Sequence, residues 1–110
     1  MKKKLLIILI AIALVALVVF IPKKTHPYAN SNITSQIFET ENGFGYKIFI
    51  EGNLFIDQST IPAVSGNISF KSKSDAEITA DLAIEKIRKG EIPPTINTKE
   101  LESLGVIWSG

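Results

Sequence analysis

Residues 46–58, YKIFIEGNLFIDQ, predict a β-hairpin around which the rest of the fold is arranged. Residues 46–50 and 54–58 are rich in aromatic and β-branched residues, which favour strands. Between them stand Glu51-Gly52-Asn53, residue types that are common in turns. The stretch therefore predicts two antiparallel strands joined by a tight connection.

The length of that connection decides which side chains share a face of the hairpin. With a three-residue loop, one face carries two apolar pairs, Ile50 with Leu54 and Ile48 with Ile56. The opposite face then carries an aromatic pair and a charged pair, Phe49 with Phe55 and Lys47 with Asp57. We expect the three-residue loop, because a two-residue loop would scramble both sets.

Further strands are predicted on both sides of the hairpin. Residues 35–40 form a first strand that Glu41-Asn42-Gly43 closes. After the hairpin, Pro62 makes residues 60–64 a loop or an edge segment, because proline cannot donate to a β-ladder. A short strand is expected at residues 68–70, so the sheet has three or four strands.

A helix is predicted between Ser74 and Gly90. The sequence Ser74-Asp75-Ala76-Glu77 has the form of a capping box, and Gly90 is a typical helix stop. At 100° per residue one stripe faces the sheet, formed by Ala76, Ala80, Ala83, Ile84 and Ile87. Ile78 and Leu82 lie outside this stripe, so another segment covers them or they form a contact surface.

The last part of the chain predicts a second, shorter helix at Lys99–Leu104. Asn97 or Thr98 can cap it, and Gly105 ends it. The Pro93-Pro94 stretch before it is expected to be extended. The predicted fold class is therefore α+β: a small antiparallel sheet, a main helix packed on one face and a short C-terminal helix.

The amino-terminal residues predict a membrane anchor. Residues 5–21 are an uninterrupted apolar run that would span about 26 Å as a helix, close to the thickness of a bilayer core. We expect a basic cytoplasmic head at 1–4, a transmembrane signal anchor at 5–21, a polar tether at 22–34 and an extracytoplasmic domain at 35–108. The alternative is a signal peptide that is cleaved to release a secreted domain.

Composition excludes several classes of function. The chain has 110 residues and no Cys, which excludes a multidomain enzyme, a disulfide framework, a thiolate metal site and a lipidated cysteine. Residues 30–110 carry seven basic and eleven acidic side chains, a net charge of −4. This balance argues against nucleic acid or anionic lipid as the partner of the domain, because phosphate binding needs clustered Lys and Arg.

Few residues suggest catalysis. The single histidine, His26, lies in the tether, so a Ser-His-Asp arrangement or a histidine metal cluster is not available to the domain. Carboxylates that could act as acid and base are Asp57 and the row Glu77, Asp81 and Glu85, although a row at helical spacing is more often a solvated face. Gly43-Phe44-Gly45 lacks the helix and lysine of a phosphate loop, which favours a β-bulge or a turn. We assign no catalytic residue, cofactor or metal.

An aromatic and charged group gives the sharper hypothesis. On a sheet with one face covered by a helix, the other face could present a partner-binding patch of Phe49, Phe55, Lys47 and Asp57. The alternative is that the two phenylalanines are core residues covered by Phe38 or by residues 93–108, because so small a domain needs its aromatics for stability.

Five motifs occur in order between about residues 37 and 106: GFGY at 43–46, IPAV-x-G at 61–66, Phe70, PPTI at 93–96 and LGV at 104–106. In this order they resemble a family of short bacterial envelope proteins classed as a domain of unknown function. The resemblance implies an exported amino terminus and a compact α+β domain, and it assigns no catalytic residues.

These observations favour a noncatalytic envelope module that is held in the bacterial inner membrane through residues 5–21 and binds an envelope protein or a surface glycan. Two functions from other classes remain as alternatives. One is a small carboxylate-dependent hydrolase, and the other is a structural subunit of a membrane assembly.

Overall fold

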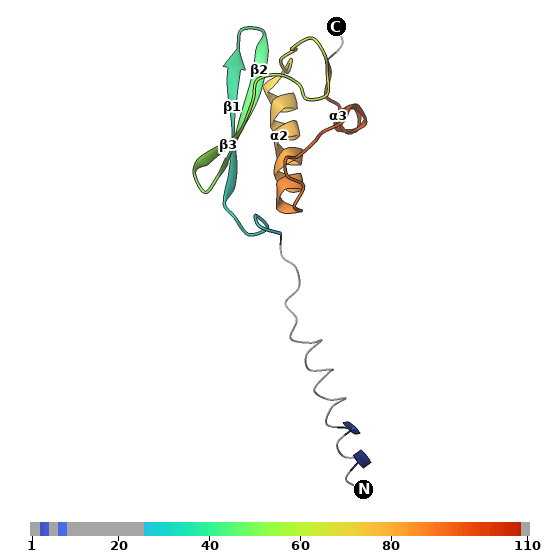
Figure 1. The fold of residues 1–110 in the computed structure, drawn as a ribbon. Coiled ribbons are helices and arrows are strands. Elements are labelled where there is room, and N and C mark those ends of the chain that lie inside the picture. Colours follow the sequence, from blue (N-terminus) through green and yellow to red (C-terminus); the bar gives the residue numbers. More distant parts are fainter. Residues whose placement is uncertain (1–2, 5–6, 9–25, 109–110) are drawn as a thin grey trace.

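The computed structural model describes residues 3–4, 7–8 and 26–108. An antiparallel sheet is built from three consecutive strands, β1 (Ile33–Thr40), β2 (Gly43–Ile50) and β3 (Asn53–Gln58), in the order β1-β2-β3. Two helices follow, α2 (Lys73–Arg88) and α3 (Thr98–Leu104). Both lie on the same side of the sheet (Figure 1). The predicted α+β class is thus confirmed, with a three-stranded sheet and two helices.

The predicted transmembrane anchor at residues 5–21 lies outside the described residues, apart from Ile7 and Ile8. Within the described residues, no helix combines the length and the apolar character that crossing a bilayer requires.

The β2–β3 hairpin corrects the expected loop. Ile50 pairs with Asn53, so the loop has two residues, Glu51 and Gly52, whose φ angles of 50° and 78° are both positive. Such angles are those of a type I′ turn, which matches the twist of the flanking strands. The predicted pairs of Ile50 with Leu54 and of Phe49 with Phe55 are therefore wrong.

A β-bulge then restores the other half of the predicted register. The register shifts between Ile48 and Phe49, and Phe55 is the extra residue on β3. Beyond the bulge Ile48 pairs with Ile56 and Lys47 with Asp57, as predicted. Because the bulge adds one residue to the short loop, only the pairs nearest the turn differ from expectation.

The GFGY motif begins β2. Gly43-Phe44-Gly45 forms regular strand, which corrects the expected bulge or turn, and Thr40 pairs with Gly43 across a turn of two residues. Phe44 also exchanges two backbone hydrogen bonds with Phe70, of 2.9 and 3.0 Å. The expected strand at 68–70 is reduced to this single bridge. A Cβ at Gly43 would fall on the Phe70 carbonyl, so glycine permits the bridge.

Helix α2 begins at a different N-cap from the expected one and ends at the expected glycine. The Ser72 hydroxyl, and not that of Ser74, accepts a 3.0 Å hydrogen bond from the Asp75 N–H. At the other end Gly90 donates to the Ile87 carbonyl and Glu91 to the Lys86 carbonyl, with Gly90 at a φ of 90°. This is a Schellman motif, so the glycine stop is confirmed.

The predicted alanine stripe of α2 faces the core. Ala76, Ala80, Ala83 and Ile87 are buried, and Ile84 packs half-buried beside them. Thr79, which the stripe omits, is also fully buried, and its hydroxyl is satisfied there by donating to the Asp75 carbonyl at 2.8 Å. Alanines have no bulk beyond Cβ, so the helix can approach the β2 side chains Tyr46, Ile48 and Ile50 closely.

Tyr46 lies in the contact between α2 and β2, where water is excluded. Its ring is buried and lies 5.9 Å from the ring of Phe70, centroid to centroid. Burial raises the pKa of the Tyr46 hydroxyl to about 12, because the phenolate is poorly solvated there.

Lys86 joins α2 to the C-terminal segment. Its Nζ lies 2.7 Å from the Glu100 carboxylate on α3 and 3.6 Å from that of Glu91, and it donates to the Thr95 carbonyl at 2.6 Å. Asn97 caps α3 in a capping box with Glu100, which decides between the two expected caps. The hydrogen bond from Lys86 lowers the pKa of Glu100, and Glu100 raises that of Lys86.

The close helix contact predicts that larger residues on the stripe destabilise the domain. We expect Ala80→Leu or Ala83→Leu in the full-length chain to cost about 1–3 kcal/mol through overpacking. The control is Ile78→Leu on the exposed side of α2, which should change stability by less than about 0.5 kcal/mol. Thermal melts that are unchanged by both alanine substitutions would show that the stripe is not tightly packed.

The Lys86–Glu100 pair predicts a defined pH dependence. A carboxyl whose pKa is lowered in the folded protein stabilises the fold at pH values above its ordinary pKa. This stabilisation is lost as the pH falls through the lowered pKa. Lys86→Met should cost up to about 1 kcal/mol at neutral pH and should flatten the loss of stability on acidification below about pH 4.5. Urea unfolding at several pH values measures both effects, with Lys99→Met as the control. An unchanged acid slope in Lys86→Met would contradict the role of the pair.

Candidate binding surface

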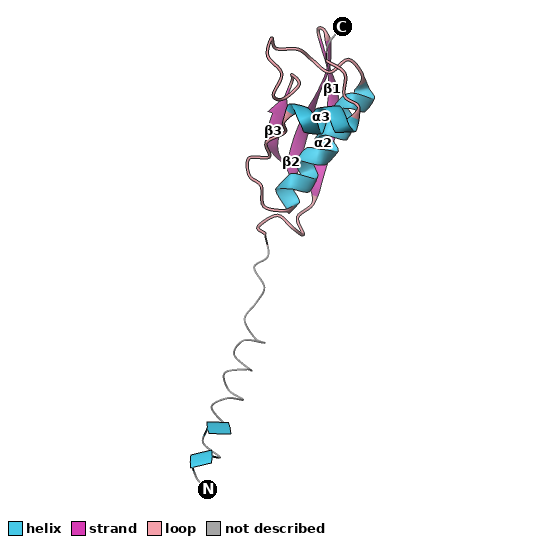
Figure 2. Ribbon diagram, turned by 90° about the vertical axis from the view of Figure 1, so that its right-hand side faces the viewer, coloured by secondary structure: helices cyan, strands magenta, loops and turns pink. Residues whose placement is uncertain are grey.

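Among the described residues, helices cover one face of the sheet. In Figure 2 both helices lie in front of the strands, and in the part of the chain that the structure describes no element lies behind them. Side chains alternate along each strand, so the neighbours of the buried Tyr46, Ile48 and Ile50 on β2 point to the open face. From the side chains that the register places there, we group four as the open-face patch: Phe38, Lys47, Phe49 and Asp57.

The centre of the open-face patch is a lysine beside an aromatic ring. Lys47 Nζ lies 5.3 Å from the centroid of the Phe38 ring, a cation–π distance. Phe38 pairs with Gly45, where a Cβ would meet the Phe38 ring at 2.7 Å. Glycine at 45 therefore leaves room for the Phe38 ring to lie over β2, next to Lys47, and Lys47 pairs in turn with Asp57 on β3.

The structure separates the two phenylalanines of the predicted patch. Phe49 is half-buried on the open face, where its partner on β3 is Leu54. Phe55, at the bulge, packs against Tyr28 with ring centroids 5.8 Å apart and an interplanar angle of 59°. Lys47, Asp57 and Phe49 thus share a face as predicted, whereas Phe55 contacts the segment that precedes β1.

Phe55 lines a hollow of about 300 Å³ at the turn end of the hairpin. Tyr28 and Leu54 line it together with the core residue Ile50, and the Glu51 carboxylate stands at its margin, accepting a 2.8 Å hydrogen bond from the Asn32 N–H. The lining is mostly apolar and aromatic.

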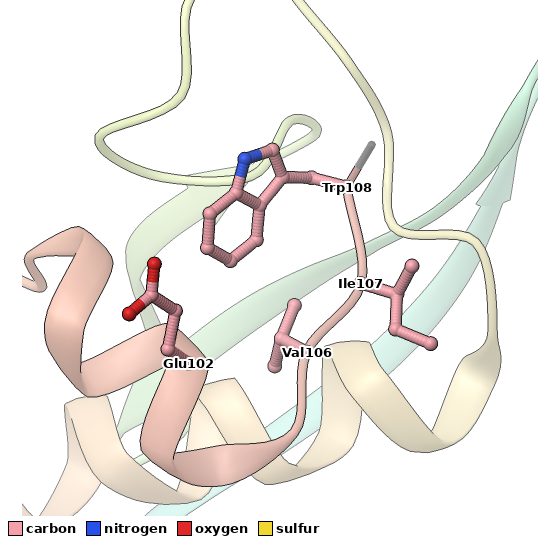
Figure 3. Close-up of a pocket in the computed structure, with 4 residues that line it drawn as sticks. All are labelled: Glu102, Val106, Ile107 and Trp108. Atoms are coloured by element: carbon pink, nitrogen blue, oxygen red, sulfur yellow. The ribbon is translucent and has the colours of Figure 1, made fainter. Parts of the chain in front are cut away.

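A second hollow of about 240 Å³ lies beside α3 (Figure 3). The Trp108 ring and the Glu102 carboxylate point toward it from two sides, and Val106 and Ile107 complete the lining. Ile107 is held by a 3.3 Å hydrogen bond from its N–H to Asp75 at the start of α2.

The candidate carboxylates do not converge. Asp57 lies on the open face, whereas Glu77, Asp81 and Glu85 are exposed on α2, on the other side of the sheet. Glu85 forms an ion pair with Lys89 at 2.8 Å, and this pair lowers the Glu85 pKa. Within the described residues, no group of three or more His, Asp or Glu side chains is placed to hold a metal ion.

His26 lies against Gly90, where a Cβ would overlap its imidazole ring. The first described residue after the apolar run therefore touches the end of α2. The sequence patterns predict neither this contact nor the surface positions of Phe38 and Tyr28. For Phe38 a signal exists, because alternate side chains along residues 34–40 point to opposite faces of the strand. For Tyr28 there is none, because it precedes the first strand.

Fold and surface together define a small α+β domain, in which two helices pack on one face of a three-stranded antiparallel sheet. The chain belongs to the family described as Domain of unknown function (DUF4907), whose model matches residues 36–103. This membership confirms the resemblance seen in the order of motifs. Comparison with curated proteins found no match. Comparison with solved structures found none either.

Proposed function

We propose that this protein is a noncatalytic module of the bacterial envelope, anchored in the inner membrane by residues 5–21, which binds a protein partner through its open-face patch. The observation that carries the proposal is the sheet face that no described element covers, with Phe49 and the Lys47–Asp57 pair side by side on it. The anchor rests on the 17-residue apolar run between lysines.

The composition of the patch favours a protein partner. Protein interfaces combine a desolvated apolar or aromatic centre with charged residues at the rim. Phe49 and Phe38 supply aromatic area, and Lys47 and Asp57 supply one charge of each sign. Opposite charges at fixed positions give orientation and selectivity, since a like charge from a wrong partner is repelled.

The structure favours this binding function over the hydrolase alternative. A carboxylate mechanism needs two carboxyl groups on opposite sides of one substrate bond. Asp57 and the α2 carboxylates lie on opposite sides of the sheet, and the patch itself contains one carboxylate among its four members.

Site-specific crosslinking in cells tests the proposal. A photoreactive phenylalanine analogue is placed at Phe49 in the full-length chain, and the matched control carries it at Ile78, which is exposed on α2. We expect a protein adduct of one discrete mass at position 49 and none at 78. Asp57→Lys, introduced beside the analogue, should reduce the adduct about tenfold, the effect of losing roughly 1.4 kcal/mol of binding free energy.

Thermal melts of each variant show whether the fold is retained. Equal labelling at positions 49 and 78, or an adduct that Asp57→Lys leaves unchanged in a folded protein, would contradict binding through the open-face patch.

A further inference from the structure

Exposed apolar side chains gather at one end of the domain. Among residues 26–108, five large hydrophobic side chains are exposed. Three of them belong to this end: Leu54 at 56%, Ile92 at 43% and Phe55 at 38%. Scattered exposed residues need no explanation, but a cluster marks a contact surface. We call these three residues, together with Tyr28, whose ring packs at a tilt against that of Phe55, the apolar rim.

Several contacts place the apolar rim where the chain enters the domain. The Ile33–Ile50 pair sets the β2–β3 turn beside the start of β1. The C-terminal end of α2 reaches the same end, because Gly90 touches His26 and Ile92 follows two residues later. Figure 1 shows the hairpin turn, the end of α2 and the start of β1 together at this end of the sheet.

The entering segment is fixed to the fold rather than free. Arg88, in the last turn of α2, donates from Nη1 to the carbonyls of Ser31 at 2.9 Å and Ala29 at 3.3 Å. The Asn32 carbonyl accepts a 2.8 Å hydrogen bond from the Glu51 N–H. These bonds set the orientation of the apolar rim relative to the point at which residue 26 leaves the domain.

Chain length then limits how far the apolar rim can stand from a bilayer. The apolar run ends at Ile21, and His26 is five residues further along. Five extended residues reach at most about 17–18 Å. The headgroup layer on each side of the hydrocarbon core is about 5–8 Å thick, so the entering end of the domain lies within a short distance of it.

We infer that the apolar rim rests on the bilayer surface, with Leu54, Phe55 and Ile92 at the boundary between headgroups and acyl chains. This inference depends on the proposed anchor at residues 5–21. The contact is apolar in character, because the charges of this end, Glu51, Glu91, Arg88 and Lys89, are two of each sign and give no net attraction to anionic lipid. Aromatic and aliphatic side chains are well suited to the interface. The contact would set the orientation of the open-face patch relative to the bilayer, with Phe49 nearest the surface because it pairs with Leu54.

Spin labelling tests the inference directly, because the chain contains no native cysteine. Single nitroxide labels are attached to Leu54→Cys, Ile107→Cys and Leu14→Cys in the full-length protein, reconstituted in nanodiscs of phosphatidylcholine. Ile107 is the matched control, since it is 58% exposed and bound to Asp75 at the far end of α2. Collision rates with oxygen, which concentrates in lipid, and with a water-soluble nickel complex report the surroundings of each label.

We expect the labels at 14 and 54 to favour collision with oxygen and the label at 107 to favour the nickel complex. If the label at 14 lies in lipid while that at 54 is as accessible to nickel as that at 107, the apolar rim does not contact the membrane and the anchor still stands. A label at 14 that is accessible to nickel would instead overturn the anchor itself. Lipid signals at both 54 and 107 would contradict contact through one end. Circular dichroism melts confirm that each labelled chain is folded.

Discussion

The close approach of the alanine face of α2 to β2 is the contact on which the rest of the domain depends. Ala76, Ala80 and Ala83 allow the helix to lie against Tyr46, Ile48 and Ile50, and these six side chains are the central layer of the buried core. Lys86 on the same helix holds the C-terminal segment through Glu100, and Arg88 holds the segment before β1. One helix thus fixes the sheet and both flanking segments. A domain of this size forms one such layer, and no element of the described residues covers the second face of the sheet.

The helix and the strands were predictable because their signals are local and agree with one another. Periodicity identified the buried stripe of α2, and Gly90 marked its end. The capping-box pattern predicts a start at Ser74, because Glu77 follows three residues later. The actual cap is Ser72, with Asp75 in the corresponding position. Two serines two residues apart present nearly the same pattern, so the choice between them depends on tertiary packing.

The site was predictable only in part, because one residue of loop length changes which side chains meet. Glu51-Gly52-Asn53 is compatible with loops of two or three residues, and the bulge at Phe55 has no distinctive sequence. The pair Lys47–Asp57 was still correct, since the bulge offsets the shorter loop. The contacts of Phe55 with Tyr28 and of His26 with Gly90 join residues far apart in the sequence, and no local pattern encodes them.

Strand β2 has one face committed to the core and one face that no described element covers. The most direct test compares neighbours on that strand, Ile48→Ala and Phe49→Ala, by urea unfolding of the full-length chain. Ile48 is fully buried, so its loss should cost about 2–5 kcal/mol. Phe49 is half-buried on the open face, and its truncation should cost about 1 kcal/mol. Equal losses at the two positions would show that both faces of the sheet belong to the core and would contradict this account.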